Sequence, residues 1–468
     1  MAPAHSSHQR DDQKILPPGT RNPFTILRIP KSPPIQLTNL SRRYGPLFTF
    51  RFPIVGSLVV VLNNHTVIHE ALVDNSDAFP NRVTSPLRHK WGIKGRIVYS
   101  YKEEHKIIRQ FVLDGMKKYY AGKLHEKVAE EARHFCTAVE EKNGKAFDPG
   151  FPLTLATGNI NAMLNFGRRY EYSDPNLTKF MEAIDYLHVK LIPSALVQKH
   201  PGLYDTFLYR KLKESQEFVV NFICDHIREH RATLDPAIPR DLIDMYLMRV
   251  DEENSSENPL FVDERGWFTI KDVITSSSLP SAASLQWVIA LLCKHQEMQE
   301  KIYEELQAAV GNDRLPEFND LHKMPFTHAF LTEILRYRTV LPVVSREVVR
   351  DVIIDGHTIP QGSNVLINYW AAERDPAVWE KPDDFVPERF LSSDGKTLIK
   401  QDSTHALGIG HRDCMGKELA MMQMFLFGTT LLQKFHLKFS PHKKPPSMQG
   451  ITKTVVVVGK FEVCATKR

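Results

Sequence analysis

Cysteine is scarce in this chain, and the spacing of the cysteines excludes two classes of protein. Five stand among 468 residues, far apart and never as a CxxC pair: Cys136, Cys224, Cys293, Cys414 and Cys464. An odd number of widely spaced cysteines argues against a disulfide framework, and the missing CxxC pairs argue against a zinc site. The sequence therefore predicts a protein of a reducing compartment.

Long apolar runs and dense basic blocks are also missing. No window reaches the roughly 20 apolar residues of a membrane-spanning helix, and residues 1–14 are polar and lack the apolar core of a signal peptide. The formal charge is only +5, from 60 basic and 55 acidic residues. We expect no nucleic-acid binding, while a basic face toward an acidic partner or a membrane surface stays open.

The composition that remains is that of an ordinary globular protein, 42% hydrophobic and 25% charged. Recurrent prolines predict an irregular lead-in over residues 1–40. Two β-rich runs follow at residues 48–52 and 58–62, and helical periodicity then dominates. Further strand signals are residues 348–349, 352–354, 365–367 and 454–458. The predicted fold is mainly α with a smaller β region, in a single domain over residues 41–468.

One cysteine stands in a context that predicts chemistry. Cys414 follows Gly408 and Gly410, comes two residues after Arg412, and precedes a helical pattern over residues 417–432. A helix N-terminus and a nearby guanidinium both stabilise a thiolate, which acts as a nucleophile or as a metal ligand. The alternative interpretation is a buried structural cysteine beside a glycine.

The run Leu407-x-x-Gly410-x-Arg412-x-Cys414-x-Gly416 resembles the haem-binding loop of the cytochrome P450 family. That family normally has phenylalanine at the first position, where Leu407 keeps an apolar shield but no aromatic face. The resemblance implies haem b as cofactor, with the Cys414 thiolate as the metal ligand. It also implies that Arg412 pairs with a haem propionate and that the glycines permit a tight turn against the porphyrin.

Two further motifs match the same family. Glu333-x-x-Arg336 resembles its ExxR pair, and the Pro-Glu-Arg-Phe run at residues 387–390 matches its PERF segment. Alone, an acid and a guanidinium three residues apart are common on a solvated helix face. In the expected order, the two motifs imply a buried network of Glu333, Arg336 and Arg389 behind the haem loop. We assign these three residues a structural role.

The resemblance implies three more haem-binding residues. Arg109 stands where the family's WxxxR helix supplies a propionate ligand, and His105 replaces the usual tryptophan. Arg346, which follows the helix carrying Glu333, resembles a further propionate ligand. The alternatives are a surface histidine at position 105 and an exposed strand arginine at position 346.

The resemblance extends from Pro17 almost to the end and is closest to the animal microsomal branch of the family. Members of that branch begin with a membrane anchor before a Pro-Pro-Gly-Pro hinge. Pro17-Pro18-Gly19-Thr20 keeps most of the hinge, and no anchor precedes it. We therefore expect a cytoplasmic or peripheral membrane location, or the endoplasmic reticulum if a native anchor has been removed.

The chain departs from its family in the long helix over the haem. That helix normally carries an acid and a threonine that organise protons for splitting dioxygen, and alignment through Trp287 places Leu279 and Pro280 at these positions. Proline inside a helix costs about 3 kcal/mol and removes a backbone donor, so a kink is predicted here. Some monooxygenases instead use water or a substrate hydroxyl, and Ser278 and Ser281 lie nearby.

Loss of both the acid and the alcohol resembles relatives that rearrange fatty acid hydroperoxides, such as epoxyalcohol synthases, allene oxide synthases and hydroperoxide lyases. The expected function is accordingly oxylipin formation without dioxygen or a redox partner, with Cys414, Leu279 and Pro280 as catalytic positions and a lipophilic substrate. The alternative is a reductase-dependent monooxygenase, for which the lysines near positions 102–118 would meet an acidic reductase. A third alternative is a haem-binding protein without turnover.

Overall fold

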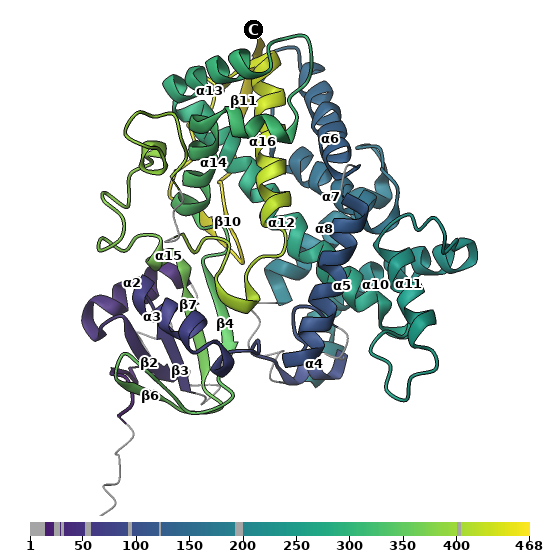
Figure 1. The fold of residues 1–468 in the computed structure, drawn as a ribbon, viewed down its shortest axis with the longest axis vertical. Coiled ribbons are helices and arrows are strands. Elements are labelled where there is room, and N and C mark those ends of the chain that lie inside the picture. Colours follow the sequence, from purple (N-terminus) through teal and green to yellow (C-terminus); the bar gives the residue numbers. More distant parts are fainter. Residues whose placement is uncertain are drawn as a thin grey trace, which may run out of the picture.

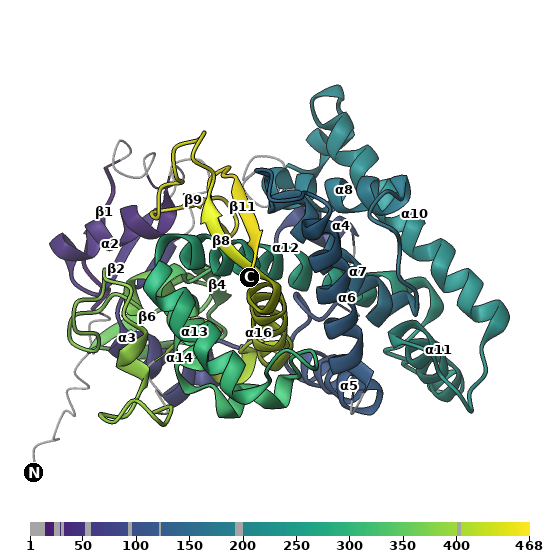
Figure 2. The same ribbon diagram turned by 90° about the horizontal axis from the view of Figure 1, so that it is seen from above.

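The structure is a computed structural model that describes residues 15–22, 29, 32–51, 58–91, 96–120, 123–191, 200–399 and 404–468. Helices account for 57% and strands for 11% of the described residues, which confirms the predicted mainly α fold with a smaller β region. The strands β2, β3, β4 and β7 lie with α2, α3 and α15 on one side, and the rest is mainly helical, with β10 and β11 among its helices (Figure 1). From above, α12 to α14 and α16 lie centrally, with α8, α10 and α11 on the side away from the sheet (Figure 2).

Helices dominate the chain after residue 62, as the helical periodicity predicts. The described α-helices are α2 (Pro33–Tyr44), α3 (His65–His69), α4 (Pro86–Trp91), α5 (Lys102–Tyr120), α6 (Lys123–Glu140), α7 (Gly150–Phe166), α8 (Pro175–Leu191), α10 (Arg210–Thr233), α11 (Leu242–Glu253), α12 (Gly266–Lys294), α13 (Gln296–Ala309), α14 (Pro325–Arg338), α15 (Tyr369–Ala372) and α16 (Lys417–Lys434). Short 3-10 turns at Pro387–Phe390 and Gly410–Arg412 carry two of the motifs.

A mixed five-stranded sheet in the order β1-β2-β3-β7-β4 forms the main β region. Its strands are β1 (Gly19–Thr20), β2 (Leu47–Arg51), β3 (Leu58–Leu62), β7 (Asn364–Asn368) and β4 (Val343–Glu347). The β-branched, almost fully buried β3 lies in the middle, antiparallel to β2 and parallel to β7. Edge strand β4 pairs antiparallel with β7, and this register sets Arg346 opposite Val365.

Three two-stranded sheets complete the β structure of the described residues. Their strands are β5 (Val352–Ile354) with β6 (His357–Ile359), β8 (Phe435–Phe439) with β11 (Val463–Lys467), and β9 (Ile451–Thr452) with β10 (Val456–Val457). Sequence reasoning missed β8 and β11. It also extended the strand signal at 454–458 beyond the two residues that pair.

Helix α12 is the core helix of the molecule. It packs against α7, α10 and α16, and Trp287 on it is fully buried and donates from Nε1 to the Val456 carbonyl at 3.0 Å. Asp263–Lys294 is also long and apolar enough to span a membrane, but 67% of its most apolar window is buried inside the protein. The same apolarity is thus accounted for by packing in the core.

One expectation about local structure differs from the fold. The lead-in predicted as irregular contains β1, which pairs with β2, and the start of α2 at Pro33, because proline is compatible with the first turn of a helix. Helix α12 continues through Pro280, and the kink predicted at this position stays a prediction. The boundaries of a single domain over residues 41–468 stay a prediction.

A buried ion pair joins α10 to the first turn of α11. His230 Nδ1 donates to the His226 carbonyl and Nε2 lies 2.7 Å from Asp241 Oδ2, so both ring nitrogens act as donors. Asp241 also caps α11, accepting from the Asp244 N–H at 3.1 Å. Burial by itself lowers the pKa of His230, but the hydrogen bond and charge of Asp241 outweigh burial and raise it.

His230→Gln is expected to destabilise the protein more at about pH 6 than at about pH 8.5. A raised folded-state pKa means that the ion pair stabilises fully below the unfolded pKa of about 6.5 and that this contribution is lost as the pH rises through the folded value. Removing one partner of a buried pair costs about 3 kcal/mol. Thermal unfolding of both proteins across this range measures the difference, and equal losses at both pH values would contradict the protonated assignment.

Candidate functional site

The loop before α16 holds Cys414 by backbone hydrogen bonds. The Cys414 N–H donates to the Leu407 carbonyl at 2.8 Å, and the Gly408 N–H donates to the His405 carbonyl at 2.8 Å. Gly410 has φ +73°, and a Cβ at this position would collide with the carbonyl oxygen of Leu72. The glycine is therefore required both by its backbone conformation and by the close approach of a neighbouring segment.

The Cys414 side chain is exposed on this loop, which contradicts the alternative of a buried structural cysteine. Although part of its surface is accessible, the Cys414 side chain lies within the fold, and burial raises the pKa of the thiol more than the Gly416 N–H and the Lys417 ammonium lower it. The protein alone therefore does not favour the thiolate that the sequence context predicts. A coordinated metal ion would deprotonate the thiol.

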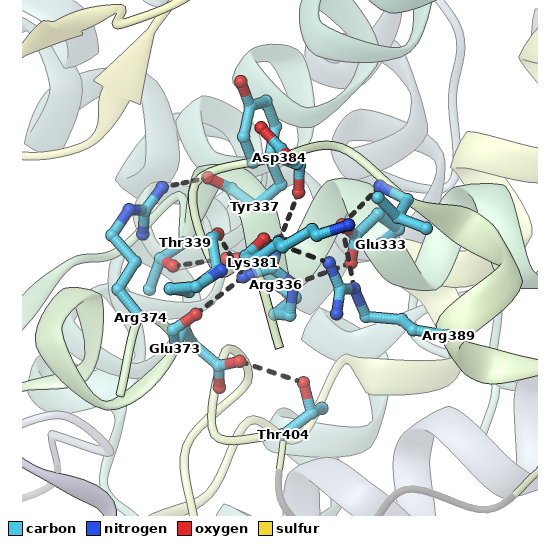
Figure 3. Close-up of polar contacts among 12 residues, drawn as sticks. Glu333, Arg336, Tyr337, Thr339, Glu373, Arg374, Lys381, Asp384, Arg389 and Thr404 are labelled. Carbon is cyan, nitrogen blue, oxygen red and sulfur yellow. Dashed lines mark hydrogen bonds and ion pairs between the residues drawn. The ribbon is translucent and has the colours of Figure 1, made fainter. Parts of the chain in front are cut away.

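The predicted network behind the loop is present (Figure 3), with Glu333 and Arg336 fully buried and Arg389 half-buried. Arg336 holds Glu333 with two hydrogen bonds, from Nε at 2.7 Å and from Nη2 at 2.8 Å. Arg389 Nε reaches the same carboxylate at 3.3 Å, and the Val386 N–H reaches it at 2.9 Å. The predicted contacts among Glu333, Arg336 and Arg389 are confirmed, and their structural role in forming the haem site stays a prediction.

Arg336 also fixes the chain around this network. Its Nη1 donates to the backbone carbonyls of Glu373 at 2.7 Å and Pro382 at 2.9 Å, and its Nη2 donates to that of Asp384 at 3.1 Å. Together with the bonds to Glu333, these contacts use every N–H of the guanidinium. The residue thereby ties α14 to the segment after α15.

Buried cationic groups gather near the Cys414 loop. Arg346 on β4 is 2% exposed and donates to the Ser345 carbonyl, and burial together with the charge of Arg82 lowers its pKa to about 9. Arg412 is also buried, and burial with the charges of Arg82 and Arg109 lowers its pKa to about 9. The alternative that Arg346 is an exposed strand residue is wrong.

Three backbone carbonyls orient Arg412, those of Pro80, Ile97 and Ser100, at 3.0, 3.3 and 2.6 Å. His105 on α5 is 5% exposed, so the surface-histidine alternative is wrong. Burial, followed by the charge of Arg412, lowers its pKa to about 3, which keeps the imidazole neutral. It retains one N–H with which it can donate.

Arg109 lies one turn after His105 on α5 but makes an ion pair that the sequence did not predict. Its Nη1 donates to the Asp413 carbonyl at 2.8 Å and its Nη2 to the Asp413 carboxylate. Lys417 Nζ lies 2.7 Å from the same side chain. Arg109 is thus anchored to the residue beside Cys414, and its i,i+4 relation to His105 puts both on one face of the helix.

These residues fit a haem. Arg346, Arg412 and His105 are buried, and the described contacts of the two arginines join them to backbone carbonyls and to no carboxylate. Buried cations without a counter-charge are costly unless an anionic group pairs with them, and the propionates of haem are such groups. The exposed sulfur of Cys414 is a suitable iron ligand.

Leu279 and Pro280 lie on α12, a separate element from the Cys414 loop. Both are half-buried, and Ser276 one turn earlier is exposed, so protein side chains do not fully cover this stretch of the core helix. Ser278 is fully buried and turned toward α7, because its hydroxyl donates to the Ile274 carbonyl and accepts from Asn161. Ser278 is therefore not available as the substitute hydroxyl.

Sequence reasoning missed Asp413 and Glu373. Asp413 had a weak signal, because it adjoins the candidate ligand and precedes Lys417 by one helical turn. Glu373 had none, since a single acid after a short helix predicts nothing by itself. Both are recognised only because distant segments of the chain meet. Arg109 and Asp413 are 304 residues apart in the sequence, and Thr404 and Glu373 are 31 residues apart.

Similar proteins are found among animal cytochromes P450. Cytochrome P450 2U1 of Mus musculus is 31% identical over 447 residues, covering 93% of this chain and 83% of the relative. Cytochrome P450 2C44 of Mus musculus is 33% identical over 451 residues, covering 93% and 90%. Cytochrome P450 2D15 of Canis lupus familiaris is 29% identical over 454 residues, covering 94% and 89%.

These similarities overturn the function expected from α12. Relatives of the 2U, 2C and 2D groups point to reductase-dependent monooxygenase activity, so the expected hydroperoxide rearrangement is wrong. The expectation that no redox partner is required is wrong for the same reason. Two departures on one helix, at Leu279 and Pro280, do not outweigh a similarity that extends over nearly the whole chain.

The motifs around Cys414, Glu333 and Arg389 and the overall similarity lead to one family. Its model, described as Cytochrome P450, matches residues 17–465. This family implies a haem-iron cofactor. The chain belongs to the cytochrome P450 family.

Proposed function

We propose that this protein is a haem-thiolate monooxygenase that receives electrons from NADPH–cytochrome P450 reductase and oxidises a lipophilic substrate. The observation that carries the proposal is the accessible Cys414 thiol on a loop shaped by glycines, beside buried Arg346 and Arg412, which contact no carboxylate among the described residues. The similarity to cytochromes P450 2U1, 2C44 and 2D15 supports the reaction class and the partner. It also supports association with the endoplasmic reticulum membrane.

In this proposal each site residue has a defined task. Cys414 would ligate the haem iron, and Arg346, Arg412 and His105 would hold the propionates by charge and hydrogen bonds. Arg109 orients the loop through Asp413. When bound, the haem supplies the redox-active iron at which dioxygen is activated. The protein binds and orients the substrate and excludes water from the reaction.

The proposal is tested with the haem-loaded protein and purified reductase. A ferrous carbon monoxide spectrum with the Soret band typical of thiolate ligation is expected. With NADPH, reductase and a panel of lipophilic compounds, mass spectrometry should detect products that carry one oxygen atom from labelled dioxygen. The thiolate band without any reductase-dependent product across the panel would contradict the monooxygenase assignment.

The double variant Leu279→Asp with Pro280→Thr is expected to raise the yield of product per NADPH several-fold. It places an acid and an alcohol on the half-buried stretch of α12. A positioned proton donor raises the rate of the step that it assists by about 10²- to 10⁴-fold. Product and hydrogen peroxide are measured together against NADPH consumption. Pro280→Ala is the control, because it restores the backbone N–H without the hydroxyl, and an equal gain in that variant would contradict a role for the alcohol.

A further inference from the structure

Glu373 contacts both the buried arginine network and the start of the Cys414 loop. The residue directly follows α15 and is 0% exposed. Its backbone carbonyl accepts from Arg336 Nη1 at 2.7 Å. Its carboxylate accepts from the Thr404 hydroxyl at 3.2 Å and from the His405 N–H. Figure 3 shows Glu373 between Arg336 and Thr404.

Hydrogen bonds to neutral groups distinguish this carboxylate from that of Glu333. Two guanidinium groups reach Glu333, whereas the contacts described for the Glu373 carboxylate come from a hydroxyl and a backbone amide. Burial without a directly bonded cation raises the pKa of Glu373 to about 8. Burying an acid costs free energy unless hydrogen bonds replace those it made with water. The contacts of Glu373 to Thr404 and His405 supply such hydrogen bonds.

The segment that Glu373 holds leads directly to Cys414. His405 is 1% exposed, and its carbonyl accepts from the Gly408 N–H at 2.8 Å. The Leu407 carbonyl accepts from the Cys414 N–H at 2.8 Å. A shift of His405 would therefore be transmitted through this turn to the residue that carries the sulfur.

We propose that Glu373 is a positioning residue that fixes the base of the Cys414 loop to the Arg336 network and thereby maintains the sulfur in the geometry required for iron ligation. This inference rests on the proposed role of Cys414 as the haem ligand. Glu373 acts through the loop, since its described contacts are to Thr404, His405 and the backbone. The fraction of haem with thiolate ligation should therefore depend on the two hydrogen bonds that its carboxyl group accepts.

Two substitutions at this position separate the hydrogen bonds from the charge. Glu373→Gln keeps an oxygen for the His405 N–H and provides an amide that donates to the Thr404 hydroxyl oxygen. Glu373→Leu removes both bonds at similar volume. We expect Glu373→Leu to lower the thiolate-type fraction of the ferrous carbon monoxide spectrum several-fold at equal haem content, and Glu373→Gln to restore it close to the unmodified level.

Glu131→Leu is the matched control. Glu131 is likewise 0% exposed and accepts from Arg169, Tyr172 and Asn159. It lies on α6, outside the segment that leads to Cys414, so its loss should lower thermal stability without changing the thiolate-type fraction. Equal spectra for Glu373→Leu and Glu131→Leu would overturn the proposal.

Thr404→Val provides a milder test if Glu373→Leu yields no folded protein. It removes one of the two hydrogen bonds to the carboxyl group, so a smaller loss of the thiolate-type fraction is expected. An unchanged fraction in this variant would count against the proposal. Absence of the thiolate band in the unmodified protein would instead refute the role of Cys414, so the two failures are distinguishable.

Discussion

Cys414→Ser is expected to abolish reductase-dependent turnover while leaving the fold almost unchanged. The substitution removes the sulfur that would donate electron density to iron. The side chain is exposed, and the loop depends on backbone hydrogen bonds and glycines rather than on the thiol. Exchanging sulfur for oxygen leaves these backbone contacts in place, so the free energy of unfolding should change by only about 0.5 kcal/mol, the small end of the range for single substitutions.

The measurement pairs the ferrous carbon monoxide spectrum with thermal unfolding. The thiolate-type band should disappear in Cys414→Ser, while the unfolding temperature of the haem-free protein should stay close to that of the unmodified chain. Cys224→Ser serves as the control, because Cys224 is a half-buried free cysteine on α10. A thiolate-type band that persists in Cys414→Ser would refute the assignment of the ligand.

The arginine network shows how far local motifs predict a site. The spacing of Glu333 and Arg336 places both on one face of a helix, and the motif at residues 387–390 identifies Arg389 as the third residue of the network. The contacts agree with that prediction, because a fixed spacing within one helix determines a geometry. The backbone carbonyls that fill the remaining N–H groups of Arg336 come from residues 37 to 48 positions away and have no side-chain signature.

Pairings of distant segments account for what sequence reasoning missed. Strands β8 and β11 are short and far apart in the chain, and they become strands by pairing with each other. Asp413 acquires its role when α5 brings Arg109 against the loop, and Glu373 when the segment after α15 meets Thr404. The function was misjudged at Leu279 and Pro280 because two residue types on one helix were given more weight than the resemblance of nearly the whole chain to the microsomal branch.

Arg336→Lys is expected to cost about 3 to 5 kcal/mol of folding free energy and to deplete the protein of haem. Lysine cannot reproduce the two parallel hydrogen bonds to Glu333, so a buried carboxylate would keep only Arg389 and the Val386 N–H. The three backbone carbonyls that Arg336 binds would compete for the N–H groups of the lysine. Removing one partner of a buried ion pair is costly in this range because the other charge stays uncompensated.

Arg314→Lys separates the effect of burial from that of losing a forked ion pair. Arg314 makes two hydrogen bonds to Asp320, at 2.6 and 2.8 Å, which closely match those between Arg336 and Glu333. Its side chain is 41% exposed, whereas that of Arg336 is fully buried. Water can replace the lost contacts of Arg314, so its substitution should cost about 1 kcal/mol or less. The free energy of unfolding and the haem content are measured for both variants. Similar losses of stability and of haem in Arg336→Lys and Arg314→Lys would mean that the forked pairing, and not burial, makes the network behind the Cys414 loop indispensable.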